Sequence, residues 1–187
     1  VDAGAQLGAM RLALQSDLLR EDGLGLQCRH DLVRHAVMAS LGPTHAQALH
    51  RKAALALAAR AEGDAEPLAV AGHWSAAQEP QTALAWMFRG AEQLKRRGRF
   101  DEARQLWKRV ADESLDATQT LQARLALAEC ELLTDLAGGR RALEMILEQA
   151  PAVAEVLQRE HIEAQALSGL VDNMVFSGDM AAARGCA

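Results

Sequence analysis

From residue 80 onward, apolar side chains return every three or four positions, the spacing that lines one face of an α-helix. Short polar stretches interrupt this pattern, and Gly98, Gly138 and Gly178 stand in three of them at a constant interval of 40 residues. Because glycine favours turns, these stretches indicate linkers between helices. The pattern predicts three helical hairpins, formed by residues 80–97 with 100–110, 117–136 with 140–149, and 160–176 with a helix from 180 onward.

Evenly spaced helix–turn–helix units predict an α-solenoid, in which each hairpin buries its apolar face against its neighbours. The hairpin of residues 80–110 fits the tetratricopeptide pattern best, with the small residues Ala91 and Ala103 where its two helices touch. Its larger core positions are Met87, Leu94, Trp107 and Val110. The next hairpin fits more loosely, through Ala126, Cys130, Leu133, Ala142 and Ile146. We expect an all-α fold, a right-handed solenoid of tetratricopeptide-like hairpins within residues 43–187.

The first 42 residues follow a different pattern. Apolar residues at helical spacing predict helices over residues 7–19 and 30–41, and residues 21–25 between them carry a turn signal. A short β-hairpin is permitted there by the alternation of Leu24, Leu26 and Cys28. Helix, hairpin and helix together predict a small winged-helix-like unit over residues 1–42.

Two further helices connect this unit to the hairpins. Gly42 and Pro43 end the preceding helix, and Thr44 with Gln47 has the spacing of a capping box, which predicts a helix over residues 44–61. Another helix is expected over residues 67–78. Proline suits the first turn of a helix, so Pro80 is expected to open the next one.

Composition agrees with helices and limits the class of partner. Aromatic residues make up only 3% of the chain and Tyr is absent, whereas β-sheets favour aromatic and β-branched residues. The net charge of −5 gives no overall attraction to nucleic acid or anionic membranes. No apolar run approaches the ~20 residues that span a bilayer. Cys28, Cys130 and Cys186 are too widely spaced for a disulfide framework, and a reducing cytoplasm fits them better. Because the first residue is not Met, we expect a fragment of a longer protein.

No catalytic site can be recognised from the sequence. The serines lack a Gly-x-Ser-x-Gly elbow, and the chain has no glycine-rich phosphate loop. The six histidines lack the two close pairs of ligands that structural zinc usually requires. In an Ala-rich solenoid, Trp74, Trp86 and Trp107 are expected to anchor the core. We therefore expect a binding segment rather than an enzyme, without a metal or cofactor of its own.

Positive charge is concentrated between Arg89 and Arg109. One interpretation is a solvated helical hairpin, in which the basic run of residues 95–99 is favoured by the macrodipole at a helix C-terminus. The functional alternative is a surface for an acidic partner. Its candidate contacts are Arg89, Lys95, Arg96 and Arg99.

Residues 26–41 read Leu-Gln-Cys-Arg-His-Asp-Leu-Val-Arg-His-Ala-Val-Met-Ala-Ser-Leu, and Leu49-His50-Arg51 and His73-Trp74 follow in predicted helices. In this order they resemble the end of the ATPase module, and the helices after it, in STAND-type bacterial transcriptional regulators such as the large ATP-binding regulators of the LuxR class. Residues 83–103 are similar to the start of their tetratricopeptide array. The resemblance covers about residues 10–110, with Cys28 in place of the usual aromatic residue.

The resemblance implies a sensor and protein-interaction segment of a nucleotide-switched regulator, which binds a partner protein, a peptide or a small inducer. It implies that ATP or ADP is bound by the parent protein outside this chain, and that DNA is bound only through another domain. His30 matches the position whose imidazole contacts the nucleotide phosphate in related switches. The other interpretation of His30 is a helix-start residue that caps its own backbone.

Two other functions are compared with this one. A free-standing tetratricopeptide scaffold for protein–protein interaction stays open as the alternative. Direct DNA binding by the winged helix is disfavoured, because the helix of residues 7–19 carries Arg11 as its one basic residue and DNA binding depends on phosphate contacts.

Overall fold

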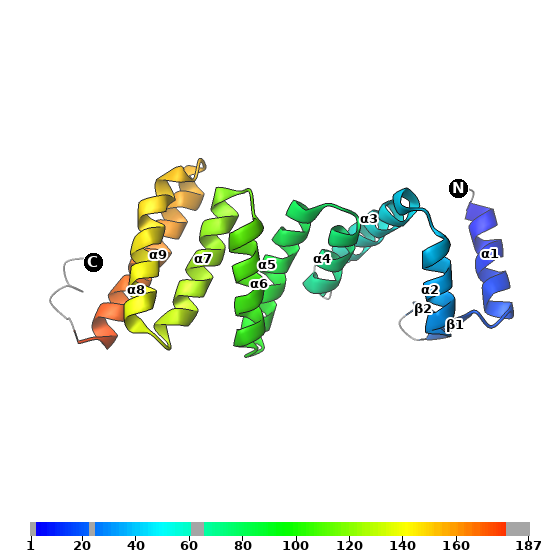
Figure 1. Ribbon diagram of the computed structural model, residues 1–187, viewed down its shortest axis with the longest axis horizontal. Helices are drawn as coiled ribbons and strands as arrows, with labels where there is room; N and C mark the ends of the chain where they lie inside the picture. Colours follow the sequence, from blue (N-terminus) through cyan, green and yellow to red (C-terminus); the bar gives the residue numbers. More distant parts are fainter. Residues whose placement is uncertain (1–2, 23–24, 61–65, 179–187) are drawn as a thin grey trace. The chain divides into compact units, whose positions relative to one another are not determined.

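The computed structural model describes residues 3–22, 25–60 and 66–178. Over these residues the chain forms nine α-helices, one 3-10 turn and one antiparallel pair of strands (Figure 1), which confirms the expected all-α helical-repeat fold. In chain order the elements are α1 (Ala3–Gln15), β1 (Leu19–Asp22), β2 (Gly25–Cys28), α2 (Asp31–Ser40), α3 (Pro43–Ala59), α4 (Pro67–Ala76), α5 (Pro80–Arg96), α6 (Phe100–Glu113), α7 (Ala117–Leu132), α8 (Leu136–Gln149), η1 (Ala150–Ala152) and α9 (Val156–Phe176).

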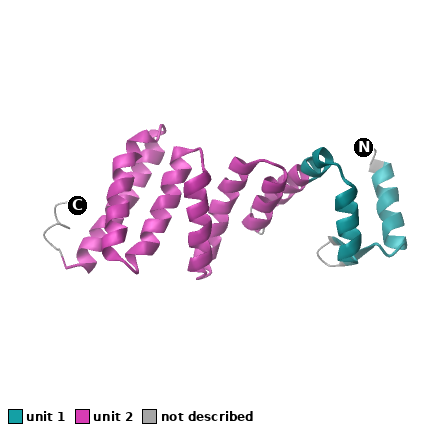
Figure 2. Ribbon diagram, in the orientation of Figure 1, with its two compact units in different colours: residues 1–49 teal, residues 50–187 magenta. Residues whose placement is uncertain are grey.

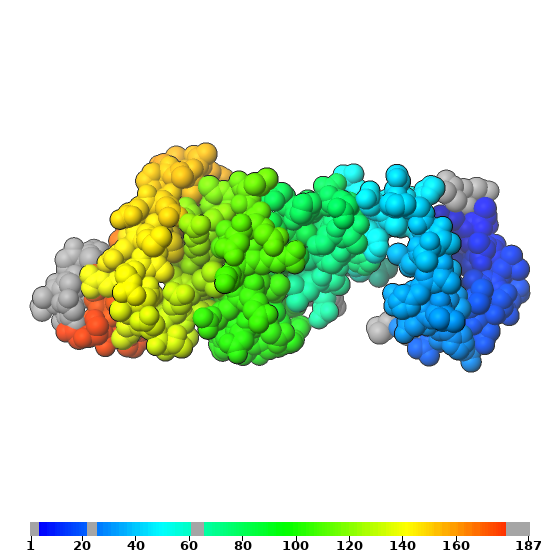
Figure 3. Space-filling view, viewed as in Figure 1, coloured from blue at the N-terminus to red at the C-terminus, as the bar shows by residue number. Residues whose placement is uncertain are grey.

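Contacts divide the chain into two compact units, residues 1–49 and 50–187 (Figure 2). This division lies inside α3, whereas the sequence pattern placed a boundary before it, after Gly42. In unit 2, each helix from α4 to α9 packs against the next one in the chain, and α7 also contacts α9. On the face of unit 2 drawn in Figure 3, α6 to α8 follow one another from green to yellow.

Unit 1 holds the predicted β-hairpin, in which Leu19 pairs with Cys28 and Arg20 with Gln27. Helix α1 ends at Gln15 and not at residue 19. The reason is Asp17, whose φ of 60° is left-handed and stops the helix, so that Leu19 begins β1. None of the side chains described in unit 1 is buried. A unit of this size without a core gains little from hydrophobic burial.

The two turns that flank α5 use the same backbone geometry. After α4 and after α5, the second residue of the turn has a positive φ, 61° at Gln78 and 76° at Gly98. The next amide then donates to a carbonyl in the last helical turn, Glu79 to Trp74 at 3.0 Å and Arg99 to Leu94 at 2.9 Å. This is the Schellman arrangement that glycine favours, since it lacks a Cβ.

The core of unit 2 lies between consecutive helices. Ala91 and Ala103 are fully buried on α5 and α6, which confirms them as the small residues of the first hairpin. The predicted larger positions Met87, Leu94, Trp107 and Val110 are buried with them. Trp74 and Trp107 are core residues as expected, and Trp86 packs against the same cluster while partly exposed. A second cluster joins α7, α8 and α9 through residues such as Leu143, Ile146 and Ile162.

The predicted turn at residues 137–139 is wrong, because α8 already begins at Leu136. The Asp135 carboxylate accepts a hydrogen bond from the Gly138 amide at 2.9 Å and caps α8. Gly138 and Gly139 therefore lie in the first turn of α8. Leu133 consequently sits in the turn, where its side chain is 79% exposed, and it is not the core residue that we expected. The helix expected from residue 180 onward lies outside the described residues.

Helix α3 begins at Pro43, so Thr44 lies within its first turn and the predicted capping box is wrong. Further along, α3 approaches α4 through two histidines, with 2.9 Å between the Nδ1 atoms of His50 and His73. Burial lowers the pKa of His73, and the nearby His50 lowers it further. A neutral ring is what this contact needs, because one nitrogen must donate while the other accepts.

We predict that Gln78→Gly raises the free energy of unfolding by about 0.5–1 kcal/mol. A side chain in the left-handed region costs about 1–2 kcal/mol, and the greater freedom of glycine in the unfolded chain offsets part of that gain. The matched control, Gly98→Ala, puts a side chain into the same conformation and should lower stability by about 1 kcal/mol. Urea unfolding measures both, and a less stable Gln78→Gly variant would contradict the prediction.

Candidate functional site

Helices α5, α7 and α9 line a groove in unit 2. Its first part is a hollow of about 360 Å³. The lining residues are Phe88, Glu92 and Lys95 on α5, Gln122, Leu125, Ala126 and Glu129 on α7, and His161 and Gln165 on α9. Apart from the adjacent Leu125 and Ala126, these positions are spaced by three or four residues within each helix, which places them on one face. The three helices α5, α7 and α9 thus border a common space.

The groove continues into a larger and more apolar hollow of about 650 Å³. Glu129 and Gln165 line both hollows, so the two are continuous. Apolar lining comes from Leu132, Leu133, Leu136 and Phe176, and polar lining from Ser168, Asp172 and Asn173. Leu133 and Phe176 are 79% and 78% exposed, so the residues that the structure describes leave most of their apolar surface uncovered.

The floor of the larger hollow is fixed by two contacts of α9. Gly169 lies so close to α8 that an added Cβ would stand 2.9 Å from Leu143 Cδ1. Asn173 is 3% exposed, and its Nδ2 donates to the Leu136 carbonyl at 2.8 Å. A hydrogen bond from a buried amide to a helix start holds the two helices in register, because leaving such a group unpaired costs about 1–3 kcal/mol.

Lys95 spans the groove wall from α5 to α7. Its Nζ donates to Glu129 Oε2 at 2.7 Å and lies 5.7 Å from the centre of the Trp107 ring. Burial by itself lowers the pKa of Lys95, but the hydrogen bond to Glu129 and the charges of Glu129 and Glu92 outweigh it, so the pKa is raised. Lys95 therefore stays charged and is already paired within the chain.

The other predicted contacts for an acidic partner lie outside the groove lining. The guanidinium of Arg89 stacks over the Trp86 ring at 4.6 Å from its centre. Arg96 is exposed at the end of α5. Of the four residues, the structure brings only Lys95 into the groove among the residues it describes.

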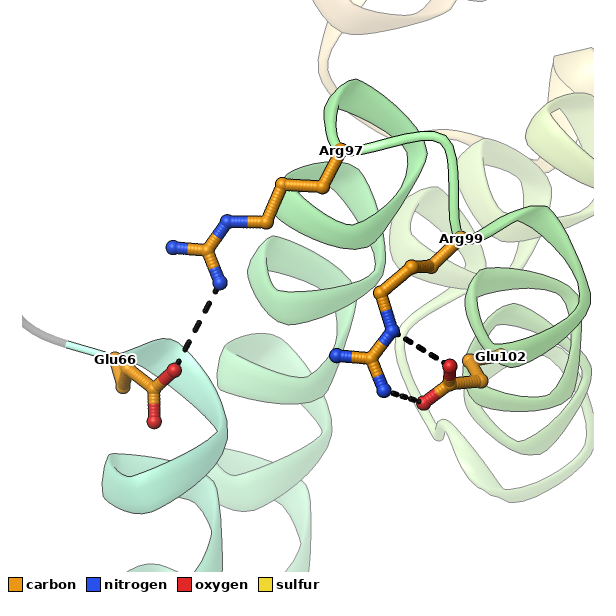
Figure 4. Close-up of polar contacts among 4 residues, drawn as sticks. All are labelled: Glu66, Arg97, Arg99 and Glu102. Carbon is orange, nitrogen blue, oxygen red and sulfur yellow. Dashed lines mark hydrogen bonds and ion pairs between the residues drawn. The ribbon is translucent and has the colours of Figure 1, made fainter.

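At the α5–α6 turn the basic side chains are held by carboxylates (Figure 4). Arg99 forms a two-pronged pair with Glu102, in which Nε donates to Oε1 at 2.6 Å and Nη2 to Oε2. Arg97 reaches toward α4, with its Nη1 3.8 Å from Glu66 Oε1. These exposed pairs reduce the free positive charge of the turn, and each contributes at most about 1 kcal/mol to stability.

His30 is the N-cap residue of α2, so the predicted helix start is confirmed. Its side chain forms no cap hydrogen bond, and the residue is exposed. The interpretation in which its imidazole caps the helix is therefore wrong. The ring is left accessible on the surface of unit 1.

The described part of the chain offers few groups for metal binding or nucleophilic catalysis. No group of three or more metal-ligating side chains gathers there. Cys28 and Cys130 are free thiols, and burial raises the pKa of Cys130 against the opposing charges of Lys95 and Arg104. A thiol with a raised pKa is a poor nucleophile at neutral pH. Within the same residues, no helix combines the length and apolarity that a membrane crossing needs.

Sequence reasoning missed most of the groove. The α9 face of Gln165, Gly169, Asp172 and Phe176 repeats every three or four residues and mixes polar with apolar groups. That repeat was the available signal, since a face wholly dedicated to the core would be uniformly apolar.

No protein-family model matches this chain, and the searches of curated proteins and of solved structures found no match.

Proposed function

We propose that this chain is a protein-interaction and sensor segment, which binds a peptide segment of a partner protein or an inducer in the groove between α5, α7 and α9. The observation that carries this proposal is the uncovered apolar lining of the larger hollow, where Leu133 and Phe176 are left exposed beside a polar rim. Concave apolar surfaces with a few convergent polar groups are typical binding sites. The proposal assigns binding, and no catalysis, to the chain.

The setting that we propose is a nucleotide-switched bacterial transcriptional regulator located in the cytoplasm. Its support is the ordered resemblance of about residues 10–110, together with the meeting of His50 and His73 from two of the resembling stretches. The accessible imidazole of His30 suits a contact with a nucleotide held by another part of such a regulator. The alternative is a free-standing tetratricopeptide scaffold, for which the groove would serve equally well.

We predict that Leu133→Ser combined with Phe176→Ser weakens peptide binding at least tenfold and changes the melting temperature little. Both side chains are mostly exposed, so the folded state loses little buried surface, whereas a bound apolar group loses its contact. Peptides recovered from a phage-displayed random library on the wild-type chain provide the probe, and fluorescence polarisation measures their affinity.

The matched control is Leu157→Ser, an exposed leucine on α9 that lies outside the groove lining. It should leave peptide affinity unchanged. The proposed function would be contradicted if every recovered peptide bound the double variant as tightly as the wild-type chain, or if no peptide were recovered.

For the regulator setting, we predict that His30→Ala weakens ADP binding by the parent protein about 5- to 70-fold, because a charge-assisted hydrogen bond to a phosphate contributes about 1–2.5 kcal/mol. Calorimetry on the wild-type and variant parent proteins measures this. His35→Ala, on the same exposed helix, is the control. Unchanged ADP affinity in His30→Ala would contradict the role of His30. A parent protein that binds no nucleotide would contradict the regulator setting and favour the free-standing tetratricopeptide scaffold.

A further inference from the structure

The groove carries an excess of negative charge. Three carboxylates, Glu92, Glu129 and Asp172, stand in its lining against the single ammonium of Lys95. Because Lys95 is paired with Glu129 at 2.7 Å, these two charges largely cancel. Glu92 and Asp172 form no ion pair with another described residue. One negative charge therefore remains on α5, in the smaller hollow, and another on α9, in the larger one.

Apolar surface lies beside this charge. Phe176 follows Asp172 by one helical turn on α9, and both line the larger hollow. A volume of about 650 Å³ accommodates large side chains, and the exposed faces of Phe176 and Leu133 offer them apolar contact. A group that binds here thus meets an apolar wall and a carboxylate at neighbouring positions.

We infer that the groove receives a segment of a partner protein that combines a large apolar side chain with Lys or Arg. The inference rests on the proposed function and adds the chemistry of the partner. The apolar side chain enters the larger hollow, and the cationic groups pair with Asp172 and Glu92. This basic partner differs from the acidic partner that the run of residues 95–99 indicated. The arginines of that run lie outside the groove lining, and the charge of Lys95 is already balanced by Glu129.

Three short random peptide libraries test this charge preference. All contain the same share of Leu and Phe, and the remaining positions are Lys and Arg in the first, Asp and Glu in the second, and Ser and Gln in the third. We expect the immobilised chain to retain the basic library about 2- to 30-fold more than the neutral one, the range that two exposed ion pairs supply. The acidic library should be retained least.

Variants locate the preference in the groove. Glu92→Lys with Asp172→Lys should reverse the order of the basic and acidic libraries, and the milder Glu92→Gln with Asp172→Asn should remove the preference. Glu148→Lys with Glu160→Lys is the control, because it changes the net charge equally at two exposed residues outside the groove lining. The control should keep the wild-type order at low salt.

Several outcomes would overturn the inference. If the control variant lost as much retention of the basic library as the groove variants, the preference would reflect only general attraction by the net charge. If the chain preferred the acidic library and Arg96→Glu removed this preference, the peptides would bind at the α5–α6 turn and not in the groove. A dimer in sedimentation that Asp172→Lys disperses would give the groove to a second copy of this chain. In the first of these cases the proposed function stands, because apolar segments would still bind in the groove, whereas the second and third cases would overturn it as well. The proposed function also fails if Leu133→Ser with Phe176→Ser leaves the retention of every library unchanged.

Discussion

Close backbone approach between consecutive helices determines the shape of unit 2. At Gly139 an added Cβ would lie 2.9 Å from the Leu132 amide nitrogen. Gly169 on α9 instead leaves room for a side chain of α8, because an added Cβ would lie 2.9 Å from Leu143 Cδ1. Alanines take the corresponding role in the first hairpin, where Ala91 and Ala103 are fully buried. Since small residues occupy these crossings, large ones such as Trp107 and Leu143 fill the space beside them. Packing at this density leaves little freedom in the spacing of the helices.

The groove follows from this spacing. One face of α5 packs against α6 and one face of α7 packs against α8, and other faces of α5, α7 and α9 line the groove. Two polar contacts hold these walls in place, the Lys95–Glu129 pair between α5 and α7 and the bond from Asn173 to the start of α8. A binding surface built on rigid helices needs little ordering when a partner arrives, and this preserves affinity.

The sequence predicted features that depend on nearby residues. The α5–α6 hairpin follows from apolar spacing and from Gly98, whose backbone geometry is local. The α7–α8 turn was misplaced because Gly138 and Gly139 resemble a turn, whereas the Asp135 cap sets the start of α8. The groove was missed because it depends on residues far apart in the chain, such as Lys95 with Glu129. No local pattern identifies which exposed faces will meet.

The free energy of unfolding of Gly139→Ala tests the close approach most directly. In an ordinary helix, alanine in place of glycine adds about 0.5–1 kcal/mol of stability, and exposed Gly72 in α4, with no atom near its missing Cβ, should show that gain. At Gly139 the backbone of Leu132 blocks the methyl group, so a loss of about 1–3 kcal/mol is expected. A gain at both positions would contradict the account, because α7 and α8 would then have room to spare.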